Sequence, residues 1–247
     1  MMFYPFRIQF LYDLQETFKK QEQPQQATTM ELTRFKAKGV FLDLDGTIVD
    51  STEAYIKAGE LAFHALGKPV PETTTLLEIP KKIEQRISID NITGNCTEKF
   101  LTVYLEAYHS ITEKKSKLLP NIASALEKLS KKSKLALITI RYVPNEVIRK
   151  ELDYLGIFKY FDHVVTSLDI SKPKPAPEAL IRCVEILGLD MCDCLIAGDS
   201  VLDVRAGKAA GAKTVAVLSG LYGRAELEKE CPNLLLPDIT ALPNYIQ

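Results

Sequence analysis

Two aspartates separated by one residue carry the strongest chemical signal in this sequence. Asp43 and Asp45 end a short apolar run that begins at Gly39, and Gly46 and a threonine follow. Side chains at positions i and i+2 of an extended segment point the same way, so both carboxylates are expected in one crevice. Two such charges ~4 Å apart repel by about 4 kcal/mol at an effective dielectric of roughly 20, which calls for a cation or a shared proton. The alternative is an Asp-Gly turn with solvated carboxylates.

Polar residues suited to binding phosphate follow three later apolar segments. Thr139 ends the second segment, and Lys172 and Lys174, each followed by proline, come after the third. Asp199 ends the fourth, and Asp203 lies about one helical turn further along the same face. Each feature also has an ordinary structural explanation. Thr139 would simply suit a β-strand, the Lys-Pro segment would be a solvated linker, and the two aspartates would cap a helix N-terminus.

The elements that must position these residues alternate in type. Short apolar or β-branched segments indicate strands, and amphipathic helical patterns separate them. This alternation predicts an α/β fold with a doubly wound, Rossmann-like parallel sheet. Ligands bind such sheets beyond the carboxyl ends of the strands, where the polar residues lie. The predicted strands are 39–45, 134–140, 163–167, 194–198 and 214–218, and the predicted helices are 121–130, 144–155, 177–187 and 201–210.

Residues 51–118 interrupt the alternation. Helical patterns cover 52–66 and 97–110 with no clear strand between them. We therefore predict an inserted helical cap over the site, and a catalytic core formed by 36–50 and 119–247. Residues 1–35, aromatic-rich and then glutamine-rich, are predicted to be an N-terminal extension and linker that serves as an appendage or as a docking arm.

The joint pattern of the four polar segments resembles the haloacid dehalogenase superfamily. The resemblance covers about residues 36–220, and the motifs occur in the family's order and topological places. Within the superfamily the chain looks like the phosphoglycolate-phosphatase-like group, which carries a helical cap between the first and second motifs. The motifs are Asp43-x-Asp45-Gly-Thr, Thr139, a Lys-Pro element and Gly-Asp199-Ser-x-x-Asp203.

This resemblance implies a phosphatase that hydrolyses a small phosphomonoester, either phosphoglycolate-like or a sugar phosphate. It assigns the nucleophile to Asp43, which would form an aspartyl-phosphate, and the general acid/base to Asp45. Thr139, the motif lysine and Gly46 would bind the phosphoryl group. Phosphoryl transfer suits this set, because it depends mainly on alignment and on neutralising charge on the equatorial oxygens.

The resemblance also implies Mg²⁺ as the cofactor. The metal ligands would be the Asp43 carboxylate, the Asp45 backbone carbonyl, Asp199 and waters, an oxygen-only set that suits a hard cation. Asp203 is expected to support these ligands rather than to bind the metal.

The choice of lysine rests on the residues that follow it. The family element reads Lys-Pro-x-Pro-acid-x-apolar, and the segment from Lys174 matches it throughout, with Glu178 as the acid. Starting at Lys172 puts Ala176 in the acid's place. We therefore predict Lys174 as the active-site lysine, with Lys172 as the alternative.

The overall composition limits the partners. The 31 basic and 32 acidic residues give a formal net charge of −1, which provides no global field for nucleic acid or an anionic membrane. No apolar run approaches the roughly 20 residues that span a bilayer. The five cysteines are scattered and odd in number, which favours free thiols in the cytoplasm. The expected partner is a small phosphorylated metabolite.

Two alternative functions remain at this stage. A sugar-phosphate mutase would keep both acids and a similar cap, and a non-catalytic binding protein would use the N-terminal arm. The oligomeric state is not readable from the sequence. Selectivity is expected to come from the cap, whose polar residues include Lys81, Lys82, Arg86 and Asn91.

Overall fold

The structure of the protein is a computed structural model that describes residues 34–247. The predicted N-terminal extension lies outside the described residues, apart from its last two positions. Phe35 already belongs to the folded body, because its backbone N–H donates to the Tyr245 carbonyl at 2.7 Å and its side chain is buried.

The core is a six-stranded, all-parallel sheet with the strand order β3-β2-β1-β4-β5-β6. The predicted α/β fold class is confirmed, and each predicted strand is found within a few residues of its expected bounds. The strands are β1 Gly39–Leu42, β2 Lys134–Ile138, β3 His163–Val165, β4 Cys194–Gly198, β5 Lys213–Val217 and β6 Leu234–Leu236.

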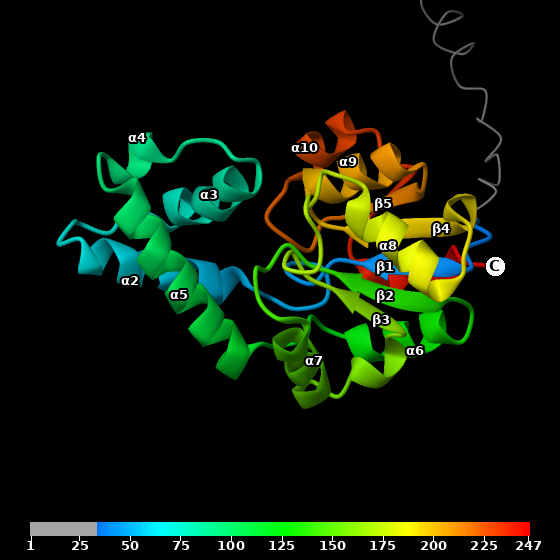
Figure 1. Cartoon of the computed structure of the whole chain (residues 1–247). Helices are drawn as coiled ribbons and strands as arrows, with labels where there is room; N and C mark the ends of the chain where they lie inside the picture. Colours follow the sequence, from blue (N-terminus) through cyan, green and yellow to red (C-terminus); the bar gives the residue numbers. More distant parts are fainter. Residues whose placement is uncertain (1–33) are drawn as a thin grey trace, which may run out of the picture. The chain divides into compact units, whose positions relative to one another are not determined.

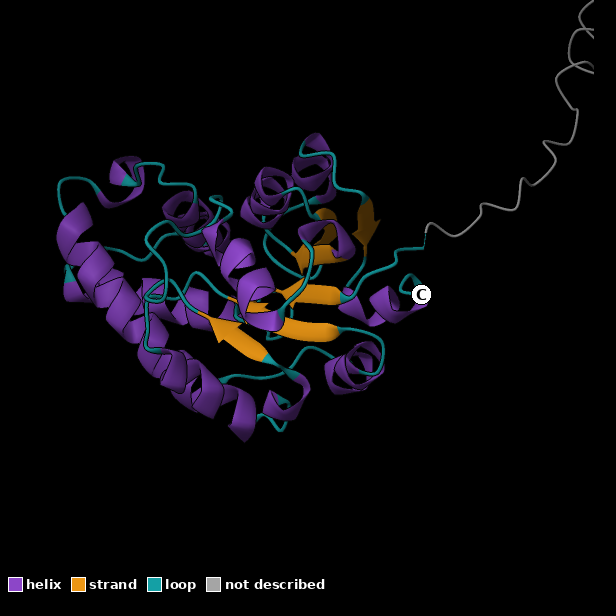
Figure 2. Ribbon diagram, turned by 45° about the vertical axis from the view of Figure 1, so that its right-hand side comes forward, coloured by secondary structure: helices purple, strands orange, loops and turns teal. Residues whose placement is uncertain are grey.

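Helices cover both faces of this sheet (Figure 2). Successive side chains of β1 point to opposite faces, so Val40 packs into the cluster with α6 and α7, whereas Phe41 packs into the cluster with α8 and α9. β1 is therefore buried on both sides, as a central parallel strand requires. The core helices are α6 Ile122–Ser130, α7 Asn145–Tyr154, α8 Glu178–Leu187, α9 Val201–Ala210 and α10 Arg224–Lys229, with short 3₁₀ turns at Phe158–Tyr160, Met191–Asp193 and Ile239–Asn244.

The insertion between β1 and β2 is helical, as predicted, and its helices stand together to one side of the sheet (Figure 1). They bury an apolar cluster of their own, which includes Phe63, Ile79 and Phe100. The chain enters and leaves the insertion side by side, because Val49 forms a β-bridge with Leu118. The helices are α2 Thr52–Ala65, α3 Thr73–Glu84, α4 Asp90–Thr93 and α5 Thr97–Lys115.

No helix among residues 34–247 combines the length and the apolar character that crossing a membrane requires.

Candidate active site

Three buried carboxylates meet at the carboxyl ends of β1 and β4. Asp43 follows β1, Asp199 follows β4, and Asp203 lies in the first turn of α9. Each is at most 6% exposed, and one carboxylate oxygen from each lies within 4.8 Å of the others. Sheet topology brings them together, because β1 and β4 are neighbours and their ends coincide.

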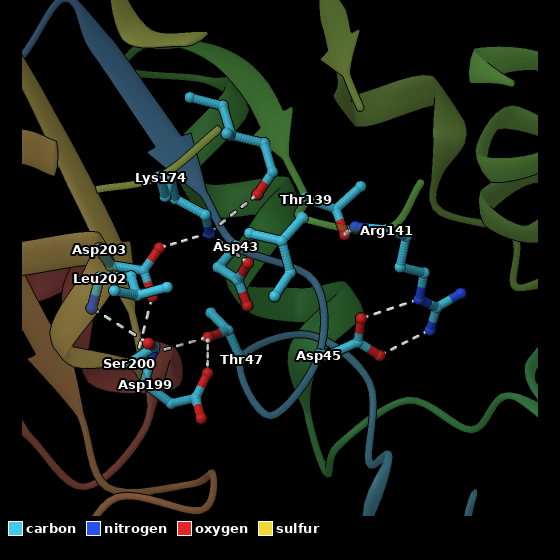
Figure 3. Close-up of polar contacts among 12 residues, drawn as sticks. Asp43, Asp45, Thr47, Thr139, Arg141, Lys174, Asp199, Ser200, Leu202 and Asp203 are labelled. Atoms are coloured by element: carbon cyan, nitrogen blue, oxygen red, sulfur yellow. Dashed lines mark hydrogen bonds and ion pairs between the residues drawn. The ribbon is translucent and has the colours of Figure 1, made fainter. Parts of the chain in front are cut away.

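Lys174 is the cation within this cluster (Figure 3). Its Nζ donates to Asp43 Oδ1 at 2.6 Å and to Asp203 Oδ1 at 2.6 Å. Lys172 is exposed, and its backbone N–H donates to the Glu178 carboxylate, which also accepts from the Ser171 N–H. The acid of the motif therefore anchors the loop that carries Lys174 inward, and the geometry favours Lys174 over Lys172.

Asp203 also has a structural task. Its Oδ2 accepts from the Ser200 N–H at 3.1 Å, while the Ser200 hydroxyl accepts from the Leu202 N–H, which together form a capping box at the start of α9. Its other oxygen accepts from Lys174 Nζ, so Asp203 joins the start of α9 to the buried lysine.

Asp199 is held by the turn that follows the first motif. The Thr47 hydroxyl donates to Asp199 Oδ1 at 3.2 Å, and the Leu221 N–H donates to Oδ2 at 3.2 Å. The carboxylate leaves no room for side chains beside it, since a Cβ on Gly46 or Gly220 would lie 2.7 or 1.7 Å from Oδ2.

Gly46 is also at φ +79°, a conformation that favours glycine. Its N–H donates to the Val49 carbonyl at 2.8 Å, so this predicted phosphate donor is engaged within its own turn.

Negative charge exceeds positive charge in this cluster. Burial raises the pKa of Asp199 well above its ordinary value, and the neighbouring Asp43 and Glu84 carboxylates act in the same direction. Burial also raises the pKa of Asp43 despite the opposing charge of Lys174. A buried set of oxygen donors with one lysine fits a hard divalent cation, which would supply the missing positive charge.

Asp45 lies apart from that cluster, and its carboxylate is held by Arg141 (Figure 3). Arg141 Nε donates to Oδ2 at 2.8 Å and Nη2 donates to Oδ1 at 2.6 Å, a bidentate pair with both side chains at most 10% exposed. The Tyr108 hydroxyl donates to Oδ1 at 2.6 Å, and the Ser51 hydroxyl also donates to Oδ1. Burial alone would raise the pKa of Asp45, but Arg141, together with the Ser51 and Tyr108 hydroxyls, holds that pKa below its usual range.

Arg141 is itself fixed by a second carboxylate. Its Nη1 donates to Glu151 Oε2 at 2.6 Å, and Glu151 also accepts a hydrogen bond from the Ser116 hydroxyl. Glu151 belongs to α7 of the core, and Ser116 caps the end of α5. The network therefore joins Asp45 to the insertion through both Tyr108 and Ser116.

Thr139 lies directly after β2, whose Leu137 pairs with Leu42 of β1. This register places Thr139 beside the end of β1, as predicted. The side chain is 2% exposed, and its hydroxyl oxygen accepts from the Arg141 N–H at 3.2 Å. The hydroxyl hydrogen is left for another acceptor.

Sequence reasoning missed four contributors to the site: Arg141, Glu151, Tyr108 and Glu84. The sequence held one signal for Arg141 as a site residue, its position two residues after Thr139. A lone arginine after a strand is, however, usually a solvated surface charge. Glu84, at the end of α3, accepts from the Ser200 and Tyr222 hydroxyls at 3.2 Å, and burial raises its pKa to about 7. No such signal exists for Glu84, Tyr108 or Glu151.

Two hollows adjoin these residues. A small one of about 10 Å³ is lined by Asp43, Lys174 and Ser200, and a larger one of about 150 Å³ extends from Asp45 into the insertion. Asp45, Glu84 and Ile140 line both. The sequence analysis singled out four polar residues of the insertion as candidates for selectivity, Lys81, Lys82, Arg86 and Asn91. None of them lines either hollow. Lys81 instead forms an ion pair with Glu226 of the core at 2.8 Å.

Comparison with known proteins identifies a family pattern over most of the chain. The pattern described as haloacid dehalogenase-like hydrolase matches residues 40–217. A phosphoglycolate phosphatase from Aquifex aeolicus is 31% identical over 202 residues, which cover 80% of this chain and 91% of that protein. Phosphoglycolate phosphatase 1 from Pseudomonas aeruginosa is 28% identical, with 82% and 77% covered.

Among solved structures, a haloacid dehalogenase-like family hydrolase from Streptococcus pneumoniae superposes with a TM-score of 0.71. The two chains are 22% identical, and the match covers 85% of this chain and 98% of the other. At that identity the likeness concerns the fold, including the helical insertion between the first two strands.

Proposed function

We propose a function from one established premise: the chain belongs to the haloacid dehalogenase-like hydrolase family, as the four motifs predicted. We propose that it is a magnesium-dependent phosphatase, which hydrolyses a small phosphomonoester through a phosphorylated Asp43. The observation that carries this proposal is the buried meeting of Asp43, Asp199 and Asp203 around Lys174. The relatives named phosphoglycolate phosphatases support the reaction class.

In the first step, a carboxylate oxygen of Asp43 attacks phosphorus and the bond from phosphorus to the ester oxygen breaks. Lys174 holds Oδ1, so we assign the attack to Oδ2. The ammonium of Lys174 and the Thr139 hydroxyl would then pair with the phosphoryl oxygens, which gather charge in the transition state.

Asp45 is assigned the proton transfers. It would protonate the departing ester oxygen, and its carboxylate would then take a proton from the water that attacks the aspartyl-phosphate, releasing inorganic phosphate and restoring Asp43. The Arg141 fork, Tyr108 and Ser51 fix the direction of this carboxylate.

Mg²⁺ would be held by the Asp43 and Asp199 carboxylates and the Asp45 backbone carbonyl. When bound, the ion supplies positive charge for the phosphoryl oxygens and offsets the repulsion among the acids. The donor set fits, because it is made of oxygen atoms and carries uncompensated charge.

We further propose the division of the chain into a core, 36–50 and 119–247, and a cap, 51–118. The separate apolar cluster of the insertion and the β-bridge between Val49 and Leu118 support these bounds. The five free thiols support a cytoplasmic location, and the site supports a small phosphorylated metabolite as the partner.

The test is release of inorganic phosphate from p-nitrophenyl phosphate by the purified chain. Turnover should require Mg²⁺, vanish on exhaustive chelation and fall to background in Asp43→Asn. An Asp199→Asn protein that folds normally should need far more Mg²⁺ for the same rate. Full turnover after chelation, or transfer of phosphate only to a second sugar and never to water, would refute the proposal.

A further inference from the structure

The larger hollow continues directly from the proposed phosphate site. It is lined by Asp45, Glu84 and Ile140, which also line the small hollow beside Asp43 and Lys174. In the proposed reaction, the ester oxygen that leaves phosphorus receives its proton from Asp45. The organic part of the substrate therefore lies in the larger hollow, a placement that rests on the proposed function.

Two helices of the insertion turn apolar faces toward this hollow. Pro80 and Ile83 lie three residues apart on α3, and Leu105 and Tyr108 lie three residues apart on α5. Residues at this spacing share one face of a helix. Ile140 adds an apolar side chain from the core, and most of the surface that the hollow presents is apolar.

The charged side chains of the lining mark the end of the hollow next to the phosphate site. Asp45 and Glu84 line both hollows, and Arg141 donates to Asp45 through two nitrogens. His109 also lines the larger hollow, but burial lowers the pKa of its ring, which favours the uncharged form. The hollow therefore has a charged inner end.

The outer end of the hollow is open to solvent and has an apolar rim. The rim consists of Leu105 from α5, which is 42% exposed, and Tyr142 from the loop after β2, which is 70% exposed. Single exposed apolar side chains are ordinary on a protein surface. These two line the same hollow, one from the insertion and one from the core, and such a patch is typical of a ligand-binding groove.

We infer that this enzyme prefers phosphomonoesters whose alcohol has an apolar body of several carbons, and that Leu105 and Tyr142 determine this specificity. The phosphoryl group and the ester oxygen lie at the charged end, beside Asp43 and Asp45. The carbons that follow lie along the apolar wall and reach the rim, where contact with both side chains removes apolar surface from water. Because the outer end is open, it sets no upper limit on the length of the chain.

The test measures kcat/KM for straight-chain alkyl phosphates from ethyl to hexyl phosphate. These alcohols have nearly equal basicity, so differences along the series report contacts of the chain rather than the chemical step. Each added methylene that leaves water should raise kcat/KM by roughly 2- to 4-fold. Pentyl phosphate should also exceed 4-hydroxybutyl phosphate, which has the same shape but ends in a hydroxyl, by roughly 3- to 10-fold.

Substitutions at the rim test where this preference arises. In the Leu105→Ser/Tyr142→Ser double variant, the ratio of kcat/KM for pentyl to 4-hydroxybutyl phosphate should fall to within about twofold of one, because the chain end no longer meets apolar side chains. The ratio cancels any effect that the two substitutions have on both esters alike. Ile186→Ser and Tyr154→Ser are the matched controls and should leave the ratio unchanged, because both residues are exposed helix positions outside the lining of the hollow.

Equal kcat/KM along the alkyl series in the unaltered protein would overturn the inference. So would a 4-hydroxybutyl ester that reacts as well as the pentyl ester, or a ratio that the double variant leaves unchanged.

The two proposals fail in different ways. Turnover of p-nitrophenyl phosphate together with no gain along the alkyl series refutes the inference alone. No turnover of any ester, in a protein that unfolds cooperatively, refutes the phosphatase proposal and the inference with it.

Discussion

At the scale of single residues, the environment of Asp45 distinguishes this site. A general acid must release a proton to the leaving oxygen, yet Arg141 holds the Asp45 pKa below its usual range. Arg141 thereby favours the carboxylate form, which suits the proposed second step, in which Asp45 would accept a proton from water. The bidentate hydrogen bonds of Arg141 also fix the direction of both Asp45 carboxylate oxygens, and a lysine ammonium cannot form such a pair.

We predict that Arg141→Lys slows proton transfer more than attack. A lysine can reach one of the two carboxylates but cannot bind both Asp45 oxygens and Glu151, so kcat for an alkyl phosphate should fall by at least about 10-fold, within the usual range for general acid/base catalysis. With p-nitrophenyl phosphate, whose leaving group needs no proton, the first step should be affected less. Single-turnover rates for both esters measure the difference, and equal losses would show a merely structural role for Arg141.

The sequence could predict those site residues whose positions are set by local pattern and sheet topology. Asp43, Asp199 and Lys174 sit at strand ends or on a proline-bound loop, so local pattern and sheet topology place them. Tyr108 and Glu151 reach Asp45 only through the packing of α5 and α7 against the sheet. No spacing within the chain encodes that packing.

At the scale of elements, α3 connects the proposed cap to the proposed phosphate site. Its last residue, Glu84, reaches Ser200 at the start of α9, and Tyr222 of the core donates to the same carboxylate oxygen. The hollow between them, about 10 Å³, has room for little more than one water. A phosphate dianion does not fit this hollow as the described residues stand.

We predict that Glu84 makes the fold less stable as pH rises. Its pKa is about 7 in the folded chain against an ordinary value of 4.5. Between these values the unfolded chain has lost the proton that the folded chain keeps, so stability falls with rising pH in this window. Glu84→Gln cannot titrate, and its advantage in unfolding free energy should be larger at about pH 8 than at about pH 5. Urea unfolding of both proteins with a chelator present checks this, and a gap that does not change with pH would contradict it.

The elements that sequence reasoning missed have weak local signals. α3 opens with Thr73, Thr74 and Thr75 and contains Pro80, all poor helix formers, and its helical state depends on burying Leu76 and Ile79. β6, Leu234–Leu236, is three residues long and gains its identity only by pairing with β5. α10 is a six-residue helix. Longer periodic segments, such as α2 and α8, were predicted within two residues of their bounds.

At the scale of the whole molecule, the residues of the proposed site all lie after position 33. Phe35 forms a bridge to Ile246, and the four motifs and the cap all lie within residues 34–247. A chain that begins at Met30 should therefore keep kcat for p-nitrophenyl phosphate within about twofold and its unfolding free energy within about 0.5 kcal/mol, the range of changes away from packed features. A shortened chain that folds but has lost all turnover would place part of the site in the N-terminal segment.

The central claim is that Asp43 carries the phosphoryl group, and the Asp45→Asn protein tests it most directly. This variant leaves Arg141 with one buried partner fewer, a change that can cost about 3–5 kcal/mol, so its fold must first be checked by urea unfolding. In this variant Asp43 should still attack p-nitrophenyl phosphate. Because the variant lacks the base that activates water, the phosphoenzyme should accumulate.

Intact-mass measurement after mixing that variant with substrate and Mg²⁺ should show one added phosphoryl group. Peptide mapping should place the group on Asp43, and the Asp43→Asn/Asp45→Asn double variant should show none. Phosphate on a serine, threonine or histidine, or an Asp43→Asn protein with near-normal turnover, would contradict the account.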